Sequence, residues 1–204
     1  MNYQKGFYLS LLMTVLFVAC QSASKKNEEK TISADRAVEE HSAETAPQIN
    51  PDSFFQAALE GDITKIETAL KSGIAVDVKD AEQRTGLMLA AYNGHHRIVK
   101  LLIEKGADVN QTDTNNRSAL MFASTGPFIP TVTELLNAGA DPNIADNVEQ
   151  WTAVMMAASE GQLEVLKLLI DRGADLTMVD VDGESAYDFA VSKGHQAVAD
   201  FLKK

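Results

Sequence analysis

One block of sequence recurs along this chain with a period of about 33 residues, and this recurrence restricts the possible folds more than any other feature. The clearest copy runs through residues 80–110. Its last five residues, Gly106-Ala107-Asp108-Val109-Asn110, return in the next copy as Gly139-Ala140-Asp141-Pro142-Asn143, and the first three of them return once more as Gly173-Ala174-Asp175. A fixed period of this length is typical of solenoids, in which each unit is one small motif that stacks on the next.

Five units account for the chain from residue 51 onward, with boundaries near 51–79, 80–112, 113–145, 146–179 and 180–204. The first unit is degenerate: it keeps Ala57-Ala58, Gly61 and Gly73 but lacks the turn segment that opens the others. The last unit ends in Lys203-Lys204. A terminal unit needs one polar side, so both ends suit capping units.

Each complete unit carries two apolar faces at helical spacing. In residues 80–110 the first face is Leu87, Ala90 and Ala91, and the second is Ile98, Val99, Leu102 and Ile103. Gly94 separates the two predicted helices, and Gly106 and its equivalents Gly139 and Gly173 suit a left-handed turn after the second helix. The residues at the expected N-cap of the first helix are Thr85, Ser118, Thr152 and Ser185.

The motifs Ala-Ala-x-x-Gly-His, at residues 90–95, and Gly-Ala-Asp-x-Asn recur in phase and resemble those of ankyrin repeats, over about residues 52–204. The resemblance implies an all-α solenoid of five stacked helix-turn-helix units with short β-turn tips. The family's Thr-Pro-Leu-His is replaced in all four complete units, by Thr85-Gly86-Leu87-Met88 and its equivalents. We interpret Met88, Met121, Met155 and Met156 as core filling rather than as an oxidant-sensitive stripe.

The middle unit replaces the Gly-His turn with Gly126-Pro127-Phe128-Ile129-Pro130. Two prolines prevent a continuous helix here, while Pro130 suits the start of the next one. Two interpretations remain open at this point. The segment is either an alternative rigid turn or a shaped bump on which Phe128 and Ile129 lie in a loop.

The amino terminus has the layout of an export signal. Lys5 is followed by an uncharged, largely apolar run over residues 7–19, which is too short to span a bilayer, and then by Cys20. Leu16-Phe17-Val18-Ala19-Cys20 resembles the lipobox of bacterial lipoproteins, although Phe17 stands where Leu is usual. The resemblance implies a signal peptide at residues 1–19 and lipidation of Cys20, the chain's only cysteine.

Residues 20–50 are rich in Lys, Glu, Ser, Ala and Thr and hold no aromatic residue, which predicts a disordered linker between the lipidated cysteine and the repeats. Gln21 resembles the residue that directs lipoproteins to the outer membrane, so we expect a lipid-anchored protein of the cell envelope, at the outer membrane's periplasmic face or on the cell surface. Lys25-Lys26-Asn27-Glu28-Glu29 is either a surface-display signal or, more simply, a solvated charge run.

Several function classes are disfavoured. A net charge of −11 repels phosphate and argues against nucleic-acid binding. The four histidines, His41, His95, His96 and His195, show no spacing suited to zinc, and Asp180 and Asp182 lie in a turn where Asp is common. No catalytic or phosphate-binding motif is present in the sequence, so we expect no enzyme activity, cofactor, metal site or small-molecule substrate.

The resemblance to ankyrin repeats implies protein binding through a surface made of turn tips and first helices. At the tips it selects Ala81, Glu82, Arg84, Thr114, Asn115, Arg117, Asn147, Val148, Trp151, Val181, Asp182 and Glu184. Behind the tips it selects Tyr92, Asn93, Thr125, Ser159 and Glu160. The candidate partner-binding residues that we retain are Arg84, Tyr92, Asn93, Thr114, Asn115, Arg117, Trp151 and Glu184.

Arg84, Arg117 and Trp151 share one register, immediately before the N-cap residue, and we expect them to form a solvent-facing row of residue types common in binding hot spots. The alternative for Trp151 is packing within its own turn, which is one residue longer than the others. The leading interpretation is a membrane-tethered module that binds a protein of the cell envelope. The alternatives are an immunity or inhibitor protein that caps a toxin or an envelope hydrolase, and a structural spacer without a specific partner.

Overall fold

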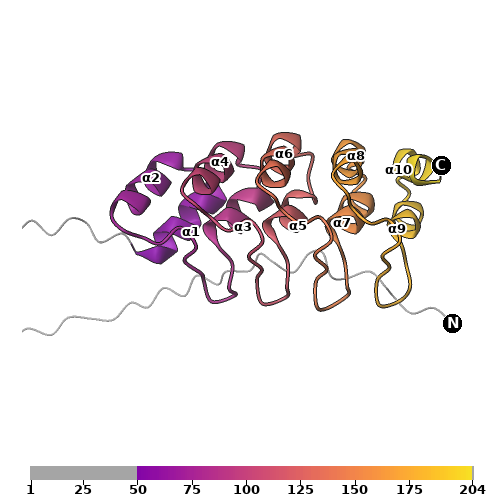
Figure 1. Ribbon diagram of the computed structural model, residues 1–204, viewed down its shortest axis with the longest axis horizontal. Helices are drawn as coiled ribbons and strands as arrows, with labels where there is room; N and C mark the ends of the chain where they lie inside the picture. The colour runs from indigo at the N-terminus through magenta and orange to yellow at the C-terminus, as the bar shows by residue number, and fades with distance from the viewer. Residues whose placement is uncertain (1–49, 204) are drawn as a thin grey trace, which may run out of the picture. The chain divides into compact units, whose positions relative to one another are not determined.

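Each repeat unit folds as a pair of short helices in the computed structural model, which describes residues 50–203 (Figure 1). The predicted signal peptide, Cys20 and the predicted linker up to residue 49 lie outside the described residues. The first helices of the five units are α1 (Pro51–Glu60), α3 (Gly86–Tyr92), α5 (Ala119–Ala123), α7 (Ala153–Ser159) and α9 (Ala186–Ser192). The second helices are α2 (Ile63–Lys71), α4 (His96–Glu104), α6 (Ile129–Asn137), α8 (Leu163–Asp171) and α10 (Gln196–Leu202).

The helix pairs stack in chain order, with the first helices in one row and the second helices in another (Figure 1). A tip loop precedes each of α3, α5, α7 and α9 and projects beside the row of first helices (Figure 1). The only β pairing in the described part is two isolated bridges at the bases of the first two tips, Lys79 with Thr85 and Thr112 with Ser118. The predicted all-α solenoid with short β-turn tips is therefore confirmed. No helix within residues 50–203 combines the length and hydropathy needed to cross a bilayer.

The caps predicted for the first helices form in three of four units. The hydroxyls of Thr85, Ser118 and Ser185 each accept a hydrogen bond from the backbone amide three residues later. The prediction is wrong for Thr152, whose buried hydroxyl has no hydrogen-bond partner. The predicted left-handed turns after the second helices are present, because Gly106, Gly139 and Gly173 all have φ of 89° or 90°.

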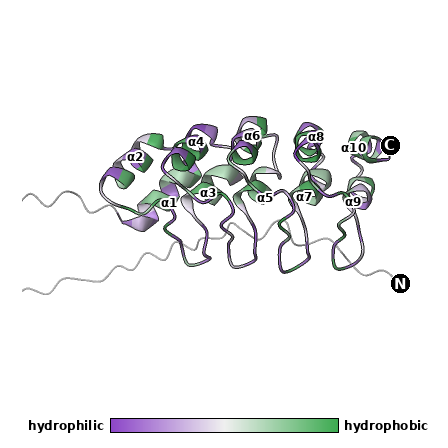
Figure 2. Ribbon diagram, viewed as in Figure 1, coloured by the Kyte–Doolittle hydropathy of each residue, from purple (hydrophilic) through white to green (hydrophobic). Residues whose placement is uncertain are grey.

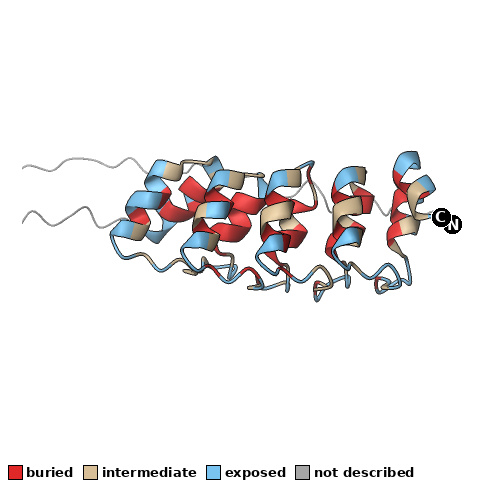
Figure 3. Ribbon diagram, turned by 45° about the horizontal axis from the view of Figure 1, so that its top comes forward, coloured by how far each residue is buried: buried red, intermediate tan, exposed pale blue. Residues whose placement is uncertain are grey.

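The core lies where successive units meet (Figure 3). The alanine pairs Ala90-Ala91 and Ala157-Ala158 are fully buried, which lets neighbouring first helices approach closely. Met88, Met121 and Met155 are also buried, so their predicted role as core filling is confirmed, whereas Met156 is only half-buried. Hydrophobic residues lie where helices face one another, and the outer sides of the second helices are largely hydrophilic (Figure 2).

At three of the four contacts between successive units, an aromatic or imidazole ring from the next unit packs against the glycine that follows a first helix. His95 lies against Gly61 and His195 lies against Gly161, and each imidazole Nε2 is 2.9 Å from a carbonyl oxygen of the preceding unit. Between the second and third units, Phe128 lies against Gly94, where a Cβ would stand 2.2 Å from the ring. These contacts fix the spacing of the units.

The Pro-rich segment of the middle unit is thus a rigid turn and not a bump. Phe128 is half-buried and occupies the register that His95 and His195 hold elsewhere, while Ile129 begins α6 and packs against the core. Of the two interpretations left open by the sequence, the exposed-loop hypothesis is wrong. The physical reason is that Gly94 and Gly126, which lack a Cβ, leave the space that the Phe128 ring occupies.

Candidate partner-binding surface

The four tips form one continuous row, because each tip is hydrogen-bonded to the next through the backbone. The amide of Thr114 donates to the carbonyl of Glu82, that of Asn147 to Asn115, and that of Val181 to Glu149, over 3.0–3.1 Å. Within each tip, the Oδ1 atom of one aspartate accepts backbone amides and closes the turn; these aspartates are Asp80, Asp113, Asp146 and Asp180. The row therefore presents its side chains from a fixed backbone.

Arg84 and Arg117 are held by the aspartates of their own tips. Arg84 Nε donates to Asp80 Oδ2 over 2.8 Å, and Arg117 donates to Asp113 Oδ2 from Nε over 3.0 Å and from Nη2 over 2.8 Å. The side chain of Asp113 is 1% exposed and that of Asp80 12%. Both arginines are half-buried, so the expectation that they face solvent freely is only partly met.

Tyr92, Phe122 and Arg117 form an aromatic cluster that joins the second and third units, called here the Phe122 cluster. The rings of Tyr92 and Phe122 meet edge to face with centroids 6.1 Å apart, and the Arg117 guanidinium carbon lies 4.9 Å from the Phe122 centroid. Tyr92 is 50% exposed. Sequence reasoning missed Phe122, although its register with Leu89, Met156 and Phe189 on the first helices was readable.

Trp151 packs on the next unit. Its ring centroid lies 4.4 Å from that of Phe189 in α9, the two planes are tilted by 52°, and Phe189 is buried. The prediction that Trp151 stands in a solvent-facing row is wrong, because its half-buried ring covers the adjacent helix. The alternative of packing within its own longer turn also missed this contact, since Phe189 is 38 positions away in sequence.

The remaining candidates lie at the tips or at the end of a first helix. Asn93 is exposed, and its side-chain amide donates to the Leu59 carbonyl over 2.7 Å. Thr114 and Glu184 are exposed and Asn115 is half-buried. Six of the eight predicted residues therefore lie in the tips, while Tyr92 and Asn93 lie at the end of α3. Ring contacts bring Tyr92 and Arg117 together through Phe122.

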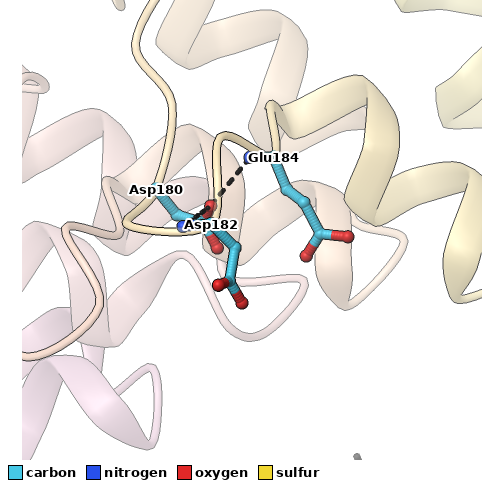
Figure 4. A group of neighbouring side chains, drawn as sticks. All are labelled: Asp180, Asp182 and Glu184. Atoms are coloured by element: carbon cyan, nitrogen blue, oxygen red, sulfur yellow. Dashed lines mark hydrogen bonds between the residues drawn. The ribbon is translucent and has the colours of Figure 1, made fainter.

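Three carboxylates from the last tip gather in one turn (Figure 4). One oxygen from each of Asp180, Asp182 and Glu184 lies within 4.8 Å of the others. Asp180 is buried, and its Oδ1 accepts the backbone amides of Asp182 over 2.9 Å and Glu184 over 2.7 Å. Closure of the turn accounts for this arrangement, because Asp80 and Asp113 close their turns in the same way.

Local hydrogen bonds lower the pKa of two carboxylates, one in each of the last two units. The hydroxyl of Thr177 and then its backbone amide donate to Asp175 and lower the pKa of that carboxyl. The hydroxyl of Ser185 and then its backbone amide do the same for the pKa of Asp188. Both groups therefore remain negatively charged at neutral pH.

Stacked helix pairs, a hydrogen-bonded row of tips and half-exposed aromatic residues beside it define a helical-repeat solenoid of the kind that binds other proteins. The family model "Ankyrin repeats (3 copies)" matches residues 54–146 and 126–204. The chain belongs to the ankyrin repeat family. Arrays of this family are protein-interaction modules and are typically without catalytic activity.

Curated relatives match only short segments. Glycerophosphocholine phosphodiesterase GDE1 from Candida albicans is 41% identical over 59 residues, which is 29% of this chain and 5% of that protein. The NAD-capped RNA hydrolase NUDT12 from Homo sapiens and that from Macaca fascicularis are each 36% identical over 52 residues, or 26% of this chain and 11% of theirs. Each matched segment is shorter than two repeats, so the similarity concerns the repeats and not those proteins' activities.

Proposed function

We propose that this chain is a protein-binding module tethered to a bacterial cell envelope, at the outer membrane, by a lipid on Cys20. The Phe122 cluster carries the proposal, because it combines a half-exposed tyrosine with an arginine whose position is fixed by three contacts. Tyr and Arg dominate binding hot spots, and a side chain held in place loses little entropy on association. Of the other retained candidates, Asn93 follows Tyr92 at the end of α3, and Arg84, Thr114, Asn115 and Glu184 lie in the tips.

The tether is supported by the amino-terminal sequence alone. A single positive residue, an uncharged run over residues 7–19 and Ala19 before Cys20 match the layout of a lipoprotein signal. A polar linker of about 30 residues would allow the repeats to reach a partner within roughly 30 Å of the membrane surface. The partner we propose is accordingly another envelope protein, with an inhibited toxin or hydrolase as the alternative class.

Co-purification from detergent-solubilised membranes tests the proposal. The full chain, carrying a carboxy-terminal tag, is recovered as wild type, as Tyr92→Ser, and as Lys100→Ser, a matched change at an exposed position of α4. We expect a stoichiometric partner with the wild type and with Lys100→Ser, and loss of most of it with Tyr92→Ser. A spacer without a partner would yield no stoichiometric protein with any of the three.

A further inference from the structure

An exposed aliphatic patch lies on the last two tips. Six large hydrophobic residues are exposed in residues 50–203, and four of them belong to these tips. They are Val148, before α7, and Leu176, Val179 and Val181, before α9, with exposed fractions between 39% and 59%. Grouped exposed aliphatic side chains mark interaction sites more often than single ones do.

The two tips that carry the patch are adjacent, because the amide of Val181 donates to the carbonyl of Glu149, the residue next to Val148. In the second and third units the matching tip positions hold Ala81 with Glu82 and Thr114 with Asn115, so the patch is confined to one end of the row. Trp151, half-buried on Phe189, follows Val148 in the same tip and extends the apolar character toward α9.

The charged side chains of the last two tips, α7 and α9 are all acidic. No Lys or Arg occurs in residues 118–166 or 173–192, which include both tips and the helices α7 and α9. Exposed carboxylates in these tips include Asp141, Glu149, Asp175 and Glu184. In the earlier tips the residue before the N-cap is Arg84 or Arg117, which pairs with the turn aspartate. In the last two tips this position holds Trp151 and Glu184, so it provides no cation for the turn aspartate.

We infer that the aliphatic patch binds a protein segment in which Lys or Arg residues accompany aliphatic side chains. This inference rests on the proposed function and gives the chemistry of its partner. Charge complementarity selects the occupant, because nucleic acids, anionic lipid surfaces and a second copy of these tips would all bring negative charge to the carboxylates. Lys or Arg side chains of the partner neutralise the carboxylates of these tips, as Arg84 and Arg117 neutralise the turn aspartates of the earlier tips.

Selection from a random dodecapeptide library displayed on phage tests the inference, with the full chain immobilised in detergent at about 150 mM salt. We expect the enriched peptides to contain an excess of Lys and Arg over acids together with Val, Leu or Ile. The leading peptide, synthesised with a fluorescent label, should bind Val148→Ser/Val181→Ser and Glu149→Gln/Glu184→Gln each roughly ten- to a hundredfold more weakly than wild type.

The matched control is Glu67→Gln/Glu104→Gln, which removes two exposed carboxylates from the second helices and should leave binding unchanged. All substituted positions are exposed, and circular dichroism verifies that the helices persist. Four results would overturn the inference. The selection could enrich no peptide, or it could enrich acidic or purely polar peptides. The control could weaken binding equally, or the valine substitutions could leave binding unaffected. The proposed function would survive each of these results if Tyr92→Ser alone still abolished partner capture.

Discussion

At the scale of single residues, Arg117 has a structural role beside the recognition role that we propose for it. Its guanidinium is bonded to the nearly inaccessible carboxylate of Asp113 and lies over the Phe122 ring. Removal of the arginine would leave a buried charge without its cation, so loss of binding in such a variant cannot be separated from loss of stability. Tyr92, half-exposed beside it, is the cleaner probe of binding.

We expect Arg117→Ala to lower the free energy of unfolding by about 2–3 kcal/mol, because Asp113 keeps its burial and loses its charged donors. Arg84→Ala should cost less, since the Asp80 side chain retains more contact with solvent. Urea unfolding followed by circular dichroism measures both. An equal or larger loss for Arg84→Ala would contradict this account of the tips.

The capping box of α9 makes stability depend on pH. Hydrogen bonds from Ser185 lower the pKa of Asp188 below the ordinary value of 3.8, so the charged carboxylate stabilises the folded state above that value. This contribution is lost as the pH falls through the lowered pKa of the folded state. Wild type should therefore exceed Asp188→Asn in melting temperature at neutral pH, and the gap should narrow as the pH falls below the ordinary value of 3.8. A gap that widens in acid would show that the carboxylate is not the stabilising group.

At the scale of elements, the junctions between units combine a left-handed glycine with a ring from the following unit. Gly161 has φ of 72° and a Cβ there would lie 2.5 Å from the His195 ring. Gly194 has the same register and φ of 78°, but no atom lies within 4 Å of its Cβ position. Alanine substitutions at these two glycines therefore separate the cost of backbone strain from the cost of a lost contact between units.

Both Gly161→Ala and Gly194→Ala incur the left-handed penalty of about 1 kcal/mol. We expect Gly161→Ala to lose about 1–3 kcal/mol more, because the added methyl group displaces His195 from its hydrogen bond with the Ser159 carbonyl. Denaturant unfolding of the two variants gives the difference directly. Equal losses would mean that the ring contact contributes nothing to stacking.

The helices and turns could be predicted from sequence because their signals are local and recur with the period. Thr85 and Ser185 cap the predicted helices, and Gly106 makes the predicted turn. The contacts of Phe128 and Trp151 could not be predicted in this way, since both depend on residues about one repeat distant. The candidate site was located only in part, because the sequence shows the register of Phe122 on its helix but not its contacts with Tyr92 and Arg117.

At the scale of the whole molecule, we propose that a lipid on Cys20 anchors the repeat array to the membrane. Cys20→Ala should abolish incorporation of radiolabelled palmitate and move the protein from the membrane to the soluble fraction, because no other cysteine is available for lipidation. The repeats, which begin at Pro51, should melt at an unchanged temperature. Palmitate that still enters the variant would refute the anchor.

The central claim, that one edge of this array binds a protein partner in the envelope, is tested most directly by photo-crosslinking in living cells. A benzophenone amino acid replaces Tyr92 in one strain and Lys100, exposed on α4, in another. The account predicts a discrete adduct of higher mass from position 92 and none from position 100. Absence of an adduct at position 92, or the same adduct from both positions, would contradict it.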